Sequence, residues 1–593
     1  MSMIQTDEAP RQRRLRLWPG VALVVMQWLA RFGIKLVVPG FEGFKLSMMG
    51  SILCTLAIAL WWAFFSRATR LERWGGTALM IVSLAAAWSL RHESMDLPWL
   101  LGYAVPVLSL ALVAWAVTSR RLADGPRRAT MAATIVLVSG VWLLVRTDGI
   151  TGDHVSKFAW RWTETPEDNL LADAGDEPSA LALTSTAAEP PEQRPVSPVG
   201  DESRRSAGET GTDWPGFRGP GRDGIVRGVR IETDWAGRPP VEMWRRRIGP
   251  GWSSFAVRGD LLYTQEQRGK TEVVSCYKAT TGQPVWTHRD AARFFESNAG
   301  AGPRGTPTLS NGRVYTFGAT GILNALDARN GSVVWTRNAA SDTGATVPYW
   351  GFSSSPLVVG DVVIVATAGQ LIAYDCSNGN PRWRGPAGGG SYSSPHQVTI
   401  DGVTQILLQS DSGAISVAPA DGKRLWEHSW PGSPIVQPAL TANGDVLIAA
   451  SAESGTRRIA VARGSGEWAV EERWTSFDLK PYFNDFVIHK GHVFGFDARI
   501  LSCIDLENGE RKWKGGRYGN GQLVLLPDQD LLLVLSEEGE LALVPAAPEE
   551  FKELARFKAI EGKTWNHPVL VGDILLVRNG QEMAAFRLPV VGR

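Results

Sequence analysis

The side chains best able to recognise or transform a ligand lie in the C-terminal two-thirds of the chain, beside short segments rich in small residues. They combine aromatic rings with a few amides, one arginine, one aspartate and two histidines. Such a mixture suits a pocket for a small polar ligand or a peptide, because the rings supply apolar contact and the polar groups fix orientation. The set comprises Trp252, Arg304, Trp350, Tyr392, His396, Tyr482, Asn484, Asp485, Tyr518, Asn520, Trp565, Asn566 and His567.

The same residues also have a purely structural interpretation. A lone histidine such as His396 or His567 is more often a hydrogen-bonded core residue than a catalyst, and polar side chains at strand starts often satisfy backbone groups. The sequence contains no G-x-S-x-G elbow and no HExxH helix. The glycine-rich segment at 385–395 leads into a strand rather than a helix, which argues against phosphate binding. Catalytic residues and metal ligands therefore remain unassigned.

Net charge and cysteine usage argue against nucleic-acid binding and zinc binding. A formal net charge of +1 leaves no general basic surface for nucleic acid. The four cysteines form no C-x-x-C pair and no Cys/His cluster, so zinc binding is not indicated. We expect each of them to be a packed thiol: Cys54, Cys276, Cys376 and Cys503.

A repeated turn shows how the candidate residues are positioned. A Thr, Asn or Asp followed by glycine, with tryptophan four residues after the glycine, occurs five times, as in RNGSVVW ending at Trp335. A period of about 40 to 50 residues is typical of a β-propeller. The glycine accepts positive φ in an outer hairpin, and the tryptophan fills the gap between neighbouring blades. The predicted blade tryptophans are Trp244, Trp286, Trp335, Trp383, Trp426, Trp474 and Trp513.

The number of inner strands predicts eight blades, with seven as the alternative. Eight short segments suit the crowded centre of a propeller, and they begin near residues 253, 306, 354, 393, 437, 484, 521 and 566. The outer positions also number eight if Trp244 opens the series and Phe557 closes it. We expect N-terminal and C-terminal segments to share one blade, which closes the ring and removes exposed edges. The inner-strand starts then converge on one mouth of the central channel.

The first 150 residues predict an α-helical transmembrane bundle. Apolar stretches near the length needed to cross a bilayer cover about 46–65, 75–90, 98–118 and 129–145. A fifth, 18–38, carries Arg31 and Lys35, which we expect to snorkel to the interface. Five spans place the arginines of 11–16, 67–73 and 120–128 on one side, as the positive-inside rule requires. If 18–38 instead lies on the membrane surface, four spans would leave the propeller on the cytoplasmic side.

These patterns predict four regions and a bacterial inner-membrane location. A basic cytoplasmic N-terminus at 1–17 precedes the transmembrane domain at 18–147, and a propeller at 213–593 follows on the periplasmic side. Between them, 148–212 is an acidic, Pro- and Ala-rich linker with few large apolar residues, a composition typical of a flexible tether.

The repeat units resemble those of a known family. ALDARNGSVVW at 325–335, AYDCSNGNPRW at 373–383 and SCIDLENGERKW at 502–513 are similar to the tryptophan-docking repeat of pyrroloquinoline-quinone-like (PQQ-like) propellers. The segment DWPGFRGPGRDG at 213–224 looks like that of membrane-tethered bacterial members. The family includes quinoprotein alcohol and glucose dehydrogenases and the propeller lipoprotein of the outer-membrane assembly machine, which binds no quinone. The resemblance is specific for the fold and weak for function.

The dehydrogenase branch of the resemblance implies pyrroloquinoline quinone with Ca²⁺, an aspartate base and a vicinal Cys-Cys disulfide. This chain has no Cys-Cys pair. Asn484 and Asp485 are its best oxygen donors for such a metal, and Arg304 is a candidate partner for a cofactor carboxylate. No Asp/Asn/Glu triplet completes a metal site, so no cofactor is assigned.

Three functions are consistent with the sequence. The favoured one is a non-catalytic binding or scaffold module that is anchored in the membrane and displays its recognition face to an envelope protein or small ligand. The alternative is a PQQ-dependent membrane dehydrogenase that oxidises an alcohol or sugar. The third is a ligand sensor, although no kinase, phosphatase or cyclase motif follows the spans.

Overall fold

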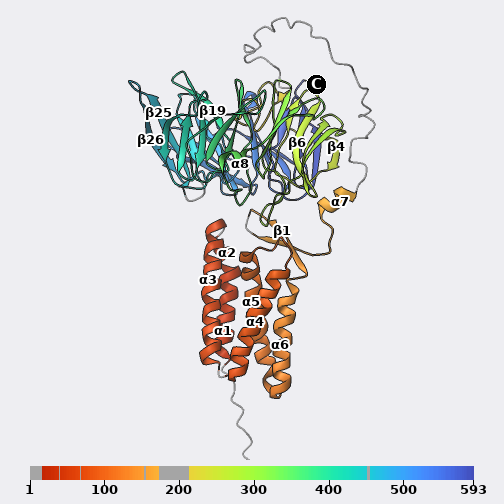
Figure 1. Ribbon diagram of the computed structural model, residues 1–593. Helices are drawn as coiled ribbons and strands as arrows, with labels where there is room; N and C mark the ends of the chain where they lie inside the picture. The colour runs from red at the N-terminus through yellow and green to blue at the C-terminus, as the bar shows by residue number, and fades with distance from the viewer. Residues whose placement is uncertain are drawn as a thin grey trace, which may run out of the picture. The chain divides into compact units, whose positions relative to one another are not determined.

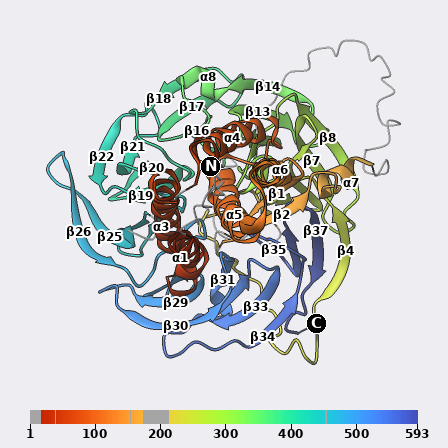
Figure 2. The ribbon, with the colours of Figure 1, turned by 90° about the horizontal axis from the view of Figure 1, so that it is seen from below.

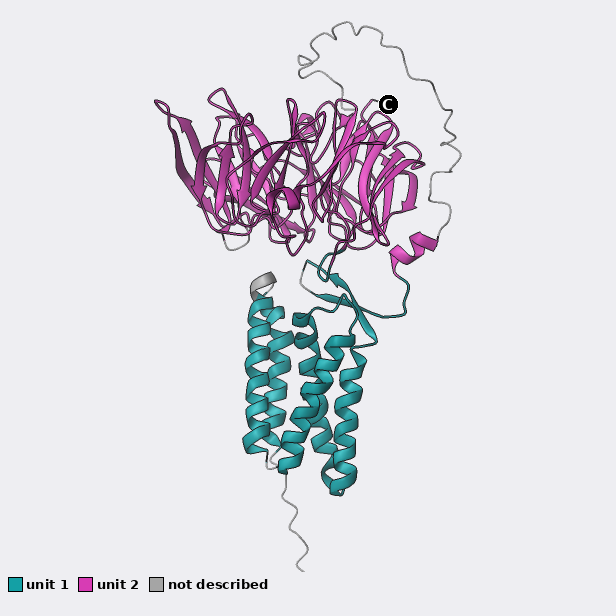
Figure 3. Cartoon of the chain, in the orientation of Figure 1, with its two compact units in different colours: residues 1–164, 296–300 teal, residues 165–295, 301–593 magenta. Residues whose placement is uncertain are grey.

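The computed structural model describes residues 17–38, 40–66, 68–152, 155–172, 213–450 and 454–592, with the side chains of 40–42 left out. It divides into two compact units, coloured separately in Figure 3. Unit 1 comprises 1–164 with 296–300, and unit 2 comprises 165–295 with 301–593. The basic N-terminus predicted at 1–17 lies almost wholly outside the described residues.

Unit 1 contains, in its described part, five long helical segments where the sequence has its five apolar stretches (Figure 1). The first, α1, continues through a π-helical turn, η1, into α2; the second, α3, continues into η2. Thr69 caps the N-terminus of α4 in a capping box. Its side chain accepts a hydrogen bond from the Glu72 backbone N–H, and the Glu72 side chain accepts one from the Thr69 backbone N–H. The bounds are α1 Trp18–Trp28, η1 Leu29–Gly33, α2 Ile34–Val37, α3 Gly40–Leu60, η2 Trp61–Phe65, α4 Arg70–Leu90, α5 Leu97–Thr118, η3 Ser119–Arg121 and α6 Asp124–Val141.

Three of these segments are long and apolar enough to cross a membrane: Trp18–Val37, Gly43–Phe65 and Leu97–Arg121. The third is the most buried, because α5 packs against α1, α3 and α6. Arg31 differs from the snorkelling that we expected. Its side chain is fully buried, its Nε donates to the Gly102 carbonyl at 3.0 Å, and its guanidinium lies 4.5 Å from the centre of the Tyr103 ring. The charge is therefore held inside the helix bundle.

The predicted linker at 148–212 has regular structure in the part that is described. The strands β1 (Val145–Ile150) and β2 (Ser156–Trp160) form a hairpin, and α7 (Pro166–Ala172) follows in unit 2. Glu167 of α7 accepts from the Gly269 backbone N–H at 2.8 Å and pairs with Arg293 at 2.9 Å, which fixes this helix to the first blade. Residues 173–212, the core of the predicted linker, lie outside the described residues.

Unit 2 is a β-propeller of eight blades within the described residues, and Figure 2 shows its sheets around a central axis. Each blade is an antiparallel sheet whose strands run in order from the centre outward. Blade 1 consists of β5 Ala256–Arg258, β6 Leu261–Arg268, β7 Thr271–Lys278 and β8 Pro284–Asp290, with β3 Asp213–Trp214 added on its inner side. Blade 2 consists of β11 Thr308–Ser310, β12 Arg313–Phe317, β13 Ile322–Asp327 and β14 Val333–Asn338, and blade 3 consists of β15 Leu357–Val359, β16 Val362–Thr367, β17 Gln370–Asp375 and β18 Pro381–Arg384. Blade 4 consists of β19 His396–Ile400, β20 Val403–Ser410, β21 Gly413–Val417 and β22 Arg424–Ser429.

The remaining blades complete the ring. Blade 5 consists of β23 Ala439–Leu440, β24 Val446–Ala449, β25 Thr456–Arg463 and β26 Trp468–Ser476, and blade 6 consists of β27 Val487–His489, β28 His492–Asp497, β29 Ile500–Asp505 and β30 Arg511–Arg517. Blade 7 consists of β31 Gln522–Leu526, β32 Leu531–Leu535, β33 Glu540–Pro545 and β34 Ala555–Lys558. Blade 8 consists of β35 Val569–Val571, β36 Ile574–Arg578, β37 Glu582–Arg587 and β4 Val241–Arg247. Four short elements connect blades or strands: β9 Phe295–Glu296, which pairs with β10 Gly300–Ala301, then α8 Ala339–Thr343 and η7 Pro527–Gln529. The N-terminal β4 pairs with the C-terminal β37, which confirms the predicted closure and the count of eight.

The blade tryptophans dock onto the turn glycines of the next blade. Trp335 of blade 2 donates its indole N–H to the Cys376 carbonyl at 2.9 Å. Gly379, with φ of 73°, lies so close to this ring that a Cβ there would be 2.6 Å from it. The pattern recurs for Trp244, Trp286, Trp383 and Trp474. Glycine is thus needed twice at each turn, for its backbone conformation and for the close approach of the ring.

Two blade tryptophans depart from this pattern. Trp426 donates to the Gln405 side chain of its own blade at 2.7 Å, and a Cβ on either outer-turn glycine of the next blade, Gly464 or Gly466, would not come within 4 Å of its ring. Trp513 keeps a backbone acceptor, the Ala547 carbonyl at 2.7 Å, but AAPEE at 546–550 replaces the turn glycine in blade 7. Both rings remain buried between blades. The burial survives where the glycine is lost, so the apolar contact is the more constant part of the motif.

Candidate functional site

Six aromatic side chains form a continuous series of ring contacts across the starts of five inner strands. Their ring centres are separated by 5.0 Å for Tyr392–Trp350, 6.2 Å for Trp350–Tyr482 and 5.3 Å for Tyr482–Phe483. The series continues with 5.0 Å for Phe483–Trp565 and 4.8 Å for Trp565–Trp252. We call these six residues the aromatic rim: Trp252, Trp350, Tyr392, Tyr482, Phe483 and Trp565. All six are half-buried.

The loops before the inner strands position these rings. In blade 3, Ser353 donates to the Tyr392 carbonyl at 2.7 Å, which ties the loop of Trp350 to the loop of Tyr392. In blade 8, the Trp565 indole donates to Glu537 at 3.0 Å. Each of the six rings is therefore partly packed against the protein and partly exposed. Five of the six rim residues belong to the predicted set; Phe483 was missed, although it stands between Tyr482 and Asn484.

Two cations border the rim. The Lys563 ammonium lies 4.3 Å from the Trp565 ring centre and 5.2 Å from that of Trp252, at distances that favour cation–π attraction. Arg304 instead donates to the backbone carbonyls of Trp350 and Gly302, at 3.2 and 3.0 Å, and lies over the Phe294 ring. Sequence reasoning missed Lys563, since its only signal is its place two residues before Trp565.

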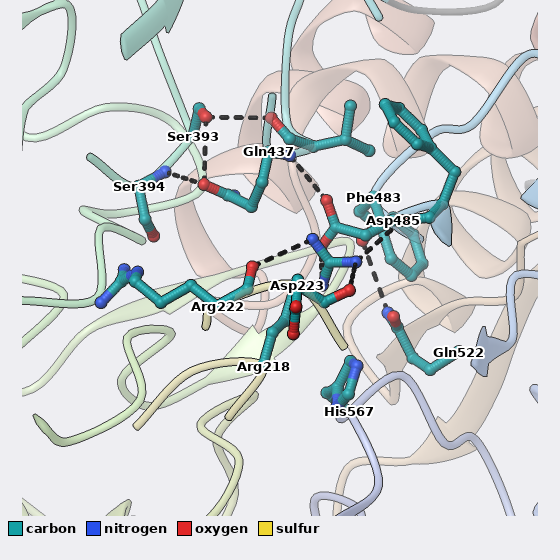
Figure 4. A network of polar contacts seen from close by, with 12 residues as sticks. Arg218, Arg222, Asp223, Ser393, Ser394, Gln437, Phe483, Asp485, Gln522 and His567 are labelled. Atoms are coloured by element: carbon teal, nitrogen blue, oxygen red, sulfur yellow. Dashed lines mark hydrogen bonds and ion pairs between the residues drawn. The ribbon is translucent and has the colours of Figure 1, made fainter. Parts of the chain in front are cut away.

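The centre of the channel holds a buried polar network that the sequence did not predict (Figure 4). Segment 213–226 crosses the ring, where Pro215 accepts from the Leu309 N–H of blade 2 and Gly224 accepts from the Leu525 N–H of blade 7. Arg218 donates to the Phe486 carbonyl at 2.8 Å and pairs with Asp485 at 3.5 Å. Arg222 donates to the carbonyls of Pro356 and Ser355, at 2.9 and 3.1 Å. The two arginines thereby link opposite sides of the ring.

The two predicted histidines lie in this network and not on the rim. Burial, together with the nearby arginines, lowers the pKa of His396 and of His567 to about 3. His567 contacts its neighbour's carbonyl, Pro568 O, through Nδ1 at 2.8 Å and stacks on Trp214. Both imidazoles are therefore neutral at physiological pH. Neither is poised for general acid–base catalysis near pH 7.

The remaining predicted residues support backbone or neighbouring side chains. The Asn484 side chain accepts from the Tyr482 N–H at 2.9 Å, and Asn566 donates to the Ser253 carbonyl at 2.8 Å. Asn520 is buried and its backbone N–H donates to Glu537 at 3.1 Å. The Tyr518 hydroxyl donates to Glu553 at 2.6 Å, outside the rim. The structural interpretation therefore accounts for the contacts of these four residues.

The candidate metal ligands do not fit a Ca²⁺–quinone site. Asp485 already faces Arg218, and its Oδ1 accepts from the Gln437 N–H at 2.6 Å. Burial raises the pKa of this carboxyl, an effect that Arg218 and the Gln437 hydrogen bond oppose. Arg304 is turned to backbone carbonyls. Among the described residues, no group of three or more His, Cys, Asp or Glu side chains is arranged to hold a metal ion.

Comparisons with known proteins identify the repeats. The sequence profile of a family described as "Outer membrane protein assembly factor BamB" matches residues 270–515. The assembly factor BamB of Yersinia pestis is 22% identical over 325 residues, which cover 51% of this chain and 70% of that protein. BamB of Shewanella oneidensis is 24% identical over 385 residues, covering 59% of this chain and 89% of that protein.

Among solved structures, the quinohemoprotein alcohol dehydrogenase of Comamonas testosteroni has a TM-score of 0.49 and 13% identity, covering 67% of this chain and 83% of that chain. The matched profile begins within blade 1 and ends within blade 6. Outside it, Trp244 docks on blade 1 with the same geometry, and four-stranded sheets continue through blades 7 and 8. The propeller of this chain is therefore a PQQ-like repeat propeller.

Proposed function

We propose that the chain is a membrane-anchored, non-catalytic binding propeller that holds an envelope polypeptide on its aromatic rim. The observation that carries the proposal is the unbroken series of six half-buried rings. Tyrosine and tryptophan provide large contact areas at a low cost in side-chain entropy, and they are enriched among residues that dominate binding energy. A row of rings also tolerates varied sequences, as a scaffold for polypeptides requires.

The partner in this proposal is an outer-membrane protein or a protein that assembles one. The named role of the Yersinia and Shewanella relatives in outer-membrane protein assembly supports this choice. The Lys563 ammonium beside Trp565 would add attraction for an acidic segment.

The proposed location is the bacterial inner membrane, with five spans and the propeller in the periplasm. Three helices are apolar enough to span on their own. The proposal adds α4 and α6 as spans, because Arg67, Arg70 and Arg73 then share a side with Arg127 and Arg128, as the positive-inside rule requires. An even number of spans would put the propeller in the cytoplasm. Reporter fusions after residue 165 distinguish the two arrangements.

Binding is tested with the full chain in detergent and a fluorescently labelled, unfolded outer-membrane β-barrel polypeptide. We expect W350A and Y482A each to weaken binding about tenfold or more, as for a central interface anchor. F477A is the matched control, since Phe477 is an exposed ring outside the rim. An unchanged Kd in a variant lacking both rim rings would overturn the proposal.

The dehydrogenase alternative is tested on the same preparation. Tryptophan fluorescence is measured during titration with pyrroloquinoline quinone and Ca²⁺, and a dye-linked assay measures the oxidation of an alcohol or sugar. We expect neither saturable quenching nor turnover. Saturable quenching with turnover would replace the scaffold proposal with the enzyme, and D485N would then be the first variant to examine.

A further inference from the structure

The centre of the channel carries more positive than negative charge. Arg218 and Arg222 are 2% and 8% exposed, whereas Asp485, at 4%, is the carboxylate that faces them. The neighbouring Asp223 is turned away, since its Oδ1 accepts from the Ile225 N–H and its Oδ2 lies 3.7 Å from Arg227. Two buried guanidinium groups therefore share one carboxylate, and a buried charge without a counterion is costly.

Among the described residues, Arg222 is the guanidinium of this pair that has no carboxylate within ion-pair distance. Its two terminal nitrogens donate to backbone carbonyls, which satisfy hydrogen bonds but supply no full negative charge. Burial, with the repulsion from Arg218, lowers the pKa of Arg222 to about 10. At physiological pH the guanidinium is still protonated, so its charge must be balanced from elsewhere.

His396 supplies a second donor beside Arg222, because Arg222 donates to the Ser355 carbonyl and the Ser355 N–H donates to Ser394, two residues before His396. Its side chain is buried, and its Nδ1 has no hydrogen-bond partner in the described structure. Arg222 is the charged group that acts on it most strongly and keeps it neutral. A neutral imidazole carries one N–H, which we assign to Nδ1 because no donor points at that nitrogen. His567 cannot play this role, since its ring already interacts with the backbone of Pro568 and of Leu523.

We propose that the channel centre binds one small inorganic anion between Arg222 and His396. The anion would accept from the His396 N–H and from N–H groups of Arg222 that the two carbonyls leave available, and it would balance the second guanidinium. A cation is disfavoured there by both arginines. The site is separate from the aromatic rim and does not depend on the proposed function.

The test compares the full chain in detergent in sodium chloride and in sodium gluconate at equal ionic strength, since gluconate is too large for a buried site. We expect chloride to raise Tm saturably by about 2 °C. Crystals grown in bromide should show an anomalous peak between Arg222 and His396. A peak with sulfate or phosphate instead would identify the anion as an oxyanion. Equal Tm values and no anomalous peak would overturn the proposal and leave ordered water at the site.

Variants separate anion binding from a structural role of the arginine. R222M lowers Tm in both salts, because it also removes two hydrogen bonds, but the difference between the salts should disappear. R293M is the control: it removes an arginine that pairs with Glu167 outside the centre, and it should keep the full difference. If R222M does not fold, H396Q provides the same test. A salt difference that persists in H396Q would contradict the assigned ligand.

Discussion

The periphery and the centre of the propeller use polar groups in opposite ways. At the periphery, a nearly uniform contact recurs from blade to blade, and each docked indole N–H has one carbonyl acceptor. At the centre, each polar contact is different. Among the residues that the structure describes, two guanidinium groups share one carboxylate and several buried polar atoms lack a hydrogen-bond partner. Repetition thus accounts for the architecture, whereas the departures from repetition mark the regions available for binding.

The largest expected effect lies at the periphery. W335A should lower the free energy of unfolding by about 3–5 kcal/mol, since it removes a buried indole and its hydrogen bond to blade 3. Urea denaturation of the full chain measures this. V333A is the matched control on the same strand, because Val333 is 50% exposed, and its effect should be within about 0.5 kcal/mol. Equal losses in the two variants would contradict the role given to blade docking.

The centre should be the more sensitive region at acidic pH. With folded pKa values of about 3 against 6.5, His396 and His567 bind fewer protons folded than unfolded, so stability falls as pH drops from 6.5 towards 3. Each histidine should cost about 2 kcal/mol at pH 5. The variant H396Q/H567Q should lose this dependence in urea titrations at constant chloride. A wild-type slope in the variant would show that other groups cause the acid lability.

A smaller effect of opposite sign is expected between blades 1 and 2. Burial raises the pKa of Glu272 to about 7, while its Oε1 accepts from the Ala319 N–H. The folded state therefore favours the protonated acid, and this stabilisation is lost as pH rises from 4.5 to 7. E272Q keeps the acceptor and removes the charge, so it should stabilise the chain by about 3 kcal/mol at pH 8. No gain in stability at pH 8 would show that neighbouring groups already stabilise the ionised Glu272 carboxylate.

The sequence predicted the periodic features well. The Gly-x-x-x-Trp turns located the outer hairpins, and the pairing of Trp244 with the C-terminal strand followed from counting strands. The centre was not predicted because its contacts join residues far apart in the chain, such as Arg222 with Ser355, without any spacing rule. Segment 213–226 gave only a resemblance, although its two arginines organise the channel. Arg31 shows the same limit in unit 1, where burial of a charge depended on the fit of η1 to α5.

The pairing of β4 with β37 also sets the timing of biogenesis. Trp244 and its partner Ala585 are about 340 residues apart, which corresponds to about 20–70 s of synthesis at ordinary translation rates. Throughout that interval the edge of β4 has no native strand to pair with. The ring can close only after the C-terminus has left the ribosome, so a chain that stops short of residue 582 would display an open, aggregation-prone strand edge.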